Sequence, residues 1–144
     1  MFIGEYKHSI DPKKRLALPS KFRKQLGTNV VVTRGLDRCL SIYPMETWSK
    51  IAEKLANFPI GENSTRSFVR MMLSGAADVE CDGQGRILLP EYLREYASLD
   101  KEVVVAGLFD RLEIWDAKKW DDYRNKAEEN TDEVAEQLGK LGIY

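Results

Sequence analysis

The hydrophobic positions of this chain gather in short runs that have the composition of β-strands. Some runs are rich in β-branched residues, and others alternate apolar with polar residues. Pro19 and Pro90 each stop an apolar run, and Gly35 and Gly107 each predict a turn after a β-branched run. The predicted strands are 16–18, 29–33, 40–43, 87–89, 102–106 and 112–115. An extended stretch is also predicted to end at Asp11 and another at Asp82.

Helical spacing of apolar residues predicts helices between and after these strands. Segments 20–26 and 91–96 each predict a short helix, and Gly27 ends the first. A longer helix extends to Phe58, where Pro59 stops it. The apolar face of this helix consists of Trp48, Ile51, Leu55 and Phe58. The next helix begins near Asn63, and its apolar face consists of Phe68, Val69 and Met72.

The C-terminal segment also has helical periodicity. Trp120 and Tyr123 share the spacing of a helix that begins at Ala117. Asn130 and Glu133 have the spacing of a capping box, which predicts the start of a last short helix. Aromatic and methionine stripes of this kind usually pack in a core, so they predict helix packing rather than a ligand site.

The chain contains an internal repeat, which is its strongest pattern. Residues 11–19, DPKKRLALP, match residues 82–90, DGQGRILLP, at an offset of 71. After a one-residue gap the match continues at an offset of 72. The further matched residues are Val31-Val32 with Val103-Val104, Gly35 with Gly107, 40–43 with 112–115, and Trp48 with Trp120.

Each repeat is too small to bury a complete hydrophobic core by itself, since it spans about 40 residues. Two similar units in one chain overcome this limit by packing as a pseudo-symmetric pair. The sequence therefore predicts a mostly β fold with helices (α+β), in which both repeats interleave their strands in one β-barrel and the helices lie on its rim. The predicted divisions are repeat 1 at 5–47, a helical connector at 48–75, repeat 2 at 76–119 and a C-terminal helical tail at 120–144.

The repeated Asp-x-x-x-Arg turn, followed by an apolar strand and proline, resembles the AbrB-like family of transition-state regulators. Two such motifs in one chain that opens with MFIGEY resemble the MraZ family in particular, and this resemblance covers essentially the whole chain. Lys14 stands where the first motif of that family often carries glycine.

The resemblance implies a swapped-hairpin barrel of the double-psi type, here formed within one chain. It also implies a nucleoid-associated transcription regulator of the division and cell-wall gene cluster, including its own promoter, that assembles as a homo-oligomeric ring. Subunits of a head-to-tail ring present one element in one sense, so we expect direct-repeat boxes in the double-stranded DNA.

Charge is distributed unevenly although the formal net charge is only −1. Residues 1–24 hold seven basic and two acidic residues, a net charge of +5, whereas residues 121–144 have a net charge of −4. A basic end is a recognised sign of a polyanionic partner. A solvated surface that is basic by chance is the other interpretation, and the charge pattern alone does not decide between them.

The motif of repeat 1 concentrates these basic residues, whereas residues 73–96 of repeat 2 have a net charge of −3. Basic side chains neutralise phosphates, and arginine also recognises guanine in the major groove. We therefore expect repeat 1 to contact DNA and repeat 2 to be structural. The expected DNA-binding residues are Lys7, Lys13, Lys14, Arg15, Lys21 and Arg23.

The Asp–Arg pair of each motif has a second interpretation. Asp11 and Arg15 recur as Asp82 and Arg86, so a salt bridge across the turn would explain both copies without DNA. Asp11, Asp82 and Arg86 are assigned to this structural motif, because aspartate forms turns by accepting backbone N–H groups. For Arg15, a structural role and a DNA contact both remain open.

Other classes of protein have little support in the sequence. No catalytic, cofactor or small-molecule motif is present, and His8 with the isolated Cys39 and Cys81 does not form a metal-binding pattern. No apolar segment is long enough for a membrane span, and the N-terminus does not resemble a signal peptide, so we expect a cytoplasmic protein. A purely structural ring or a protein-binding module is the alternative to a DNA-binding regulator.

Overall fold

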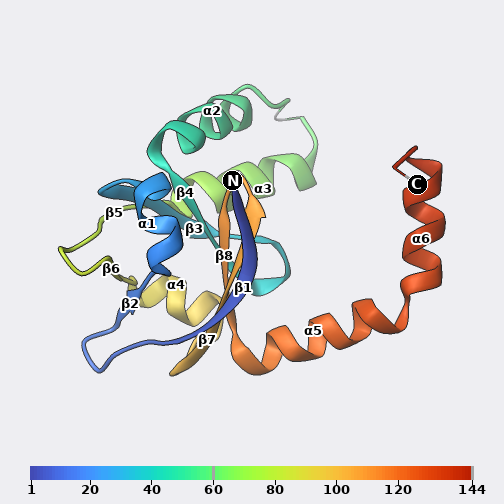
Figure 1. The fold of residues 1–144 in the computed structure, drawn as a ribbon. Helices are drawn as coiled ribbons and strands as arrows, with labels where there is room; N and C mark the ends of the chain where they lie inside the picture. The colour runs from blue at the N-terminus through green and yellow to red at the C-terminus, as the bar shows by residue number, and fades with distance from the viewer. Residues whose placement is uncertain (60, 144) are drawn as a thin grey trace.

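A computed structural model describes residues 1–59 and 61–143 and shows an α+β protein with a mostly antiparallel sheet (Figure 1). Ile60 of the predicted connector and Tyr144 of the predicted tail lie outside the described residues. The strands are β1 (Phe2–Ser9), β2 (Arg15–Ala17), β3 (Asn29–Arg34), β4 (Leu40–Pro44), β5 (Ala77–Glu80), β6 (Arg86–Leu88), β7 (Glu102–Phe109) and β8 (Leu112–Asp116). The helices are α1 (Ser20–Leu26), η1 (Leu36–Arg38), α2 (Met45–Ala56), α3 (Asn63–Gly75), α4 (Glu91–Tyr96), α5 (Ala117–Glu129) and α6 (Thr131–Lys140).

The strands of the two repeats interleave, as the sequence predicts. Six strands form a sheet in the order β1-β7-β8-β4-β3-β5, and β2 pairs with β6 in a separate two-stranded ladder. The first strand of each repeat pairs with the other repeat, since β1 pairs with β7 and β5 with β3. Each repeat therefore completes the sheet of the other.

The predicted barrel is not closed. β1 and β5 remain the edges of the six-stranded sheet. In the described part of the chain, an isolated bridge joins Ile10, just after β1, to Leu16 of β2. β2 and β6 are three residues long, and a single residue separates β2 from Pro19 and β6 from Pro90. Such short strands pair with each other but do not provide a continuous ladder between the two edges.

Strand pairing also corrects the alignment of the repeats. His8 pairs with Val103, and the equivalent strand of repeat 2 pairs Val79 with Val30. Val30 is therefore equivalent to Val103, so the offset in this strand is 73 rather than the predicted 72. Side chains alternate between the faces of a strand, and this register matches the residues that enter the shared core, Val30 and Val32 in one repeat with Val103 and Val105 in the other.

Three local predictions also differ from the structure. β7 continues through Gly107 instead of turning there, because its residues pair with β1 as far as Phe109. α2 ends at Ala56, so Phe58 lies outside the helix, next to the Pro59 that restricts its backbone. Asn130 does not cap α6 with its side chain, because its amide donates to the carbonyl of Lys126 instead.

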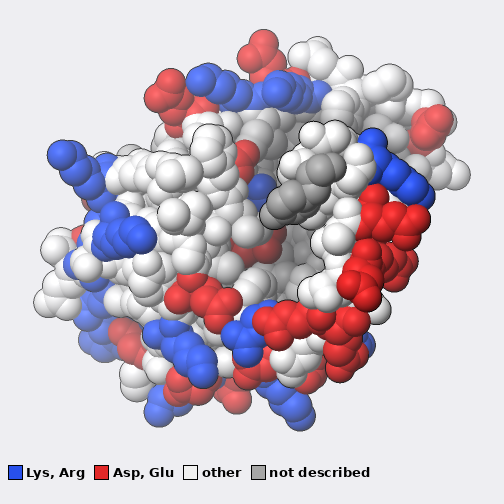
Figure 2. Space-filling view, turned by 45° about the vertical axis from the view of Figure 1, so that its right-hand side comes forward, with Lys and Arg blue, Asp and Glu red and all other residues white. Residues whose placement is uncertain are grey.

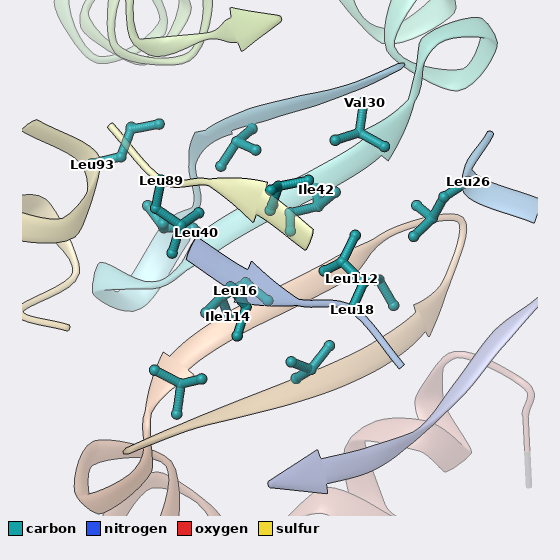
Figure 3. Packing of buried hydrophobic residues seen from close by; sticks show 14 of the residues in the cluster. Leu16, Leu18, Leu26, Val30, Leu40, Ile42, Leu89, Leu93, Leu112 and Ile114 are labelled. Carbon is teal, nitrogen blue, oxygen red and sulfur yellow. The ribbon is translucent and has the colours of Figure 1, made fainter. Parts of the chain in front are cut away.

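One hydrophobic core lies between the ladder and the sheet, and both repeats contribute to it. Leu16 and Leu18 of repeat 1 and Ile87 and Leu89 of repeat 2 are at most 1% exposed. Figure 3 shows Leu16, Leu18 and Leu89 converging with side chains of β4 and β8. The two repeats therefore share this core, and neither repeat forms a separate hydrophobic core.

The helices contact different parts of this body. α2 and α3 pack against β3, whereas α5 packs against β7 and β8. α6 stands apart from the sheet at the end of α5 (Figure 1). No described helix combines the length and the hydropathy that a membrane span requires.

The close approach of β1 to β7 makes Gly107 sensitive to substitution. A Cβ atom at Gly107 would lie 2.6 Å from the backbone nitrogen of Ile3. We expect Gly107→Ala to lower the free energy of unfolding by about 1–3 kcal/mol, because backbone atoms must shift. Gly83→Ala is the control, since nothing lies within 4 Å of its added Cβ. Equal chemical denaturation midpoints for the two variants would contradict this strand pairing.

Candidate nucleic-acid interface

The Asp11–Arg15 segment forms a tight turn that is held by its own residues. The backbone N–H of Asp11 donates to the carbonyl of Arg15 at 2.9 Å. The backbone N–H of Arg15 donates to Oδ1 of Asp11 at 2.9 Å, and the guanidinium Nε of Arg15 donates to Oδ2 at 2.7 Å. One carboxylate therefore fixes both the backbone and the arginine side chain of this turn.

The Asp82–Arg86 segment repeats this geometry. Its corresponding three hydrogen bonds are 2.9, 2.9 and 2.7 Å long. In both turns the pKa of the aspartate lies below its ordinary value, primarily because the backbone N–H of the arginine donates to the carboxylate. The common geometry shows that the Asp–Arg pair shapes the turn in both repeats, so Arg15 has a structural contact whether or not it also binds DNA.

The tips of the two turns differ in charge and in backbone chemistry. Lys13 and Lys14 are exposed in the first turn, where Gln84 and Gly85 stand in the second. Lys14 has a φ of 65° and Gly85 a φ of 72°. Lysine thus occupies a left-handed position that favours glycine, and this lysine adds a positive charge to the exposed tip.

The interleaved fold separates the predicted DNA-binding residues. Lys13, Lys14 and Arg15 share one turn, whereas Lys7 lies exposed on β1. Lys21 of α1 is also exposed, and its ammonium lies 5.9 Å from the centre of the Tyr6 ring, which is a cation–π contact.

Arg23 lies beside the second turn, although it belongs to repeat 1. Its Nε donates to the carbonyl of Leu18 at 3.1 Å, and a Cβ atom on Gly85 would collide with its side chain. Arg94 makes the matching 3.1 Å bond to Leu89 in the other repeat. Arg23 therefore has a packing contact that the sequence did not reveal.

Lys101 is a basic residue near the first turn that sequence reasoning missed. Its carbonyl accepts the backbone N–H of Ile10 at 2.8 Å, and its side chain is exposed. With Asp100 it borders an open pocket of ≈ 430 Å³, which also includes Pro12 and Lys14. Because Lys101 belongs to repeat 2, no local motif could have placed it there, and only the correct strand register identifies its neighbours.

The described residues contain no group of three or more His, Cys, Asp or Glu side chains that could hold a metal ion. Cys39 and Cys81 are both free thiols. Burial raises the pKa of each thiol, which favours the protonated, unreactive form.

The left-handed backbone of Lys14 allows a direct test of the turn geometry. We expect Lys14→Gly to raise the free energy of unfolding by about 1 kcal/mol, because glycine adopts this conformation without a steric penalty. Lys13→Gly removes the same charge where φ is not left-handed, so it lowers stability through the greater entropy of the unfolded chain. If thermal unfolding shows the same loss for both variants, the assigned conformation of Lys14 is wrong.

Comparisons with known proteins agree with the repeat and with this double turn. The sequence model of the MraZ family, described as MraZ protein, antitoxin-like, matches residues 1–71 and again residues 72–141. Three similar proteins are named Transcriptional regulator MraZ, and each aligns over 143 residues, which is 99% of this chain and 100% of the relative. They come from Halothermothrix orenii (52% identical), Natranaerobius thermophilus (49%) and Syntrophomonas wolfei (47%). The chain therefore belongs to the MraZ family.

Proposed function

We propose that this protein is a sequence-specific DNA-binding regulator of transcription. The difference between its two turns carries this proposal, because the same Asp–Arg geometry supports two lysines in one turn and none in the other. Shape alone does not require those lysines, and Lys14 even occupies an unfavourable backbone conformation. Three relatives named as transcriptional regulators support the same function.

The first turn has the chemistry to contact both phosphate and base edges. Lys13 and Lys14 neutralise phosphates, and the counterions released on binding supply affinity that does not depend on sequence. Arg15 donates to Asp11 through Nε, which leaves donors of its guanidinium for a guanine or a phosphate. Lys101 adds a positive charge beside this turn, where Asp100 lines the same pocket.

We assign DNA recognition to repeat 1 at 5–47 and a structural role to repeat 2 at 76–119, from which Lys101 alone joins the proposed DNA surface. Arg23 is the weakest member of the predicted contact set, because it already donates to Leu18 and packs on Gly85. The connector at 48–75 and the tail at 120–144 are assigned to assembly. The interleaved repeats also support the swapped-hairpin, double-psi barrel type as the closest description of this unclosed core.

We further propose that the protein is a cytoplasmic, nucleoid-associated ring that controls the division and cell-wall gene cluster, including its own promoter. One turn per chain offers few phosphate contacts, so useful affinity requires several turns joined in one assembly. A head-to-tail ring presents adjacent turns in the same sense, which favours direct-repeat boxes. Family membership supports this assignment.

Arg15 and Arg86 form a matched pair for testing the DNA contact. Each arginine bridges its own aspartate at 2.7 Å, so alanine at either position removes the same internal contact. We expect similar decreases in melting temperature for Arg15→Ala and Arg86→Ala. Only Arg15→Ala weakens binding to the chain's own upstream DNA, by roughly tenfold, and it also reduces the salt dependence of binding.

The measurement is a fluorescence titration of folded protein at several salt concentrations. Lys13→Ala and Gln84→Ala form a second pair at equivalent positions, and Lys13→Ala alone lowers the slope of log K against log salt, by about 0.9 per lost phosphate contact. Equal losses of DNA affinity for Arg15→Ala and Arg86→Ala would contradict the proposed asymmetry.

The proposed direct repeats predict a dependence on helical phase. Adjacent turns reach one face of the duplex when boxes lie about 10 base pairs apart. Inserting about five base pairs between boxes should sharply reduce binding, and inserting about ten should partly restore it. Footprinting on respaced promoters measures this effect. Undiminished binding after the half-turn insertion, or tighter binding to inverted boxes, would exclude direct repeats.

A further inference from the structure

The C-terminal arm, which comprises α5 and α6, is attached to the body only along α5. Trp115 of β8 contacts Trp120 and Tyr123 of α5, with ring centres 5.5 and 4.9 Å apart. Arg124 pairs with Glu5 of β1 at 2.9 Å. These contacts fix the direction of α5, which carries α6 away from the sheet (Figure 1).

α6 has no partner that would explain its stability. Among the residues that the structure describes, it forms no hydrogen bond or ion pair with the body of the protein. Isolated helices shorter than about 12–15 residues are marginal in water, and α6 has 10 residues. A helix of this length therefore requires packing against another surface.

The arm presents an apolar face that is suited to such packing. Val134 and Leu138 lie one helical turn apart on α6, and Val134 is 45% exposed. With Tyr123 and Ala127 of α5 they line an open groove of ≈ 440 Å³. A contiguous apolar surface rimmed by charged residues is characteristic of a protein interaction site.

Charge disfavours a second arm as the partner. α6 holds three acidic residues and one basic residue, so its net charge is −2. Figure 2 shows acidic side chains gathered in a band on the side from which the arm projects. Pairing two arms would bring like charges together, which disfavours association. A docking surface that is basic as well as apolar complements the arm best.

α3 is the described helix that combines these two properties. It contains Arg66 and Arg70 without an acidic residue, a net charge of +2, and its Phe68 and Val69 are half-buried. α1 is basic too, but its apolar residues, Phe22 and Leu26, are fully committed to the core. α2 balances two lysines with two glutamates.

We propose that the C-terminal arm of one copy docks, through the Val134–Leu138 face, on α3 of a second copy of this chain. The contact joins two different surfaces, so it is head-to-tail and generates a closed ring when the rotation between copies closes. The inference thus deepens the homo-oligomer of the proposed function. It leaves the turn at Asp11–Arg15 outside the contact and available for DNA.

Charge reversal in the full chain tests this contact. One variant carries Glu133→Lys and Glu136→Lys on α6, and the other carries Arg66→Glu and Arg70→Glu on α3. Each variant alone should associate at least tenfold more weakly than the wild-type chain, because like charges now meet. A one-to-one mixture should recover the wild-type assembly, since each reversed arm meets a reversed α3. Analytical ultracentrifugation measures the masses, and circular dichroism verifies that each variant is folded.

The matched control is Lys50→Glu with Lys54→Glu, which makes the same charge change on α2 and should leave assembly unchanged. Wild-type assembly in both reversed variants would overturn the arm contact while the ring itself stands. Dissociation of both variants without recovery on mixing would also overturn it. A monomeric wild-type chain would refute the arm contact and the ring together, whereas the DNA contact is judged separately by Arg15→Ala.

If the Arg66→Glu, Arg70→Glu variant fails to fold, the arm alone still decides the question. Val134→Lys alters only an exposed residue of α6, so the body remains intact. It should weaken association at least tenfold, and unchanged association would overturn the proposal.

Discussion

The exchange of first strands between the two repeats is the constraint on which the rest of this structure depends. β1 completes the sheet beside β7, and β5 does so beside β3, so neither repeat has a full set of paired strands without the other. The short β2–β6 ladder then covers the shared core, which contains buried leucines from both repeats. Folding of one repeat is therefore coupled to folding of the other, as small units without separate cores require.

This exchange also redistributes charge. A count along the chain assigns Arg23 to the basic repeat and Lys101 to the acidic one. In three dimensions Arg23 packs on the second turn, and Lys101 lies beside the first. The basic surface proposed for DNA is thus built from both repeats, although its exposed tip, Lys13 and Lys14, comes from one.

Features with local causes could be predicted from the sequence, and features with distant causes could not. Proline and glycine signals identified the short helices and the Asp-x-x-x-Arg turns, since those depend on neighbouring residues. The continuation of β7 through Gly107, the offset of 73 rather than 72 at Val30 and the open barrel depend on which strands meet. The position of Lys101 beside the first turn could not be predicted for the same reason, because its neighbour Ile10 is remote in sequence.

The self-contained turn explains how one fold accommodates two different surfaces. Asp11 and Asp82 hold their turns with the same hydrogen bonds, so the residues at the tip do not have to contribute to the fold. The tip is then free to carry lysines in one repeat and Gln84 with Gly85 in the other. Lys14 is the exception, because its left-handed backbone lowers the free energy of unfolding by about 1 kcal/mol relative to glycine at this position. A residue kept at such a cost is best explained by what it contacts outside the protein, which is why charge rather than shape distinguishes the two turns.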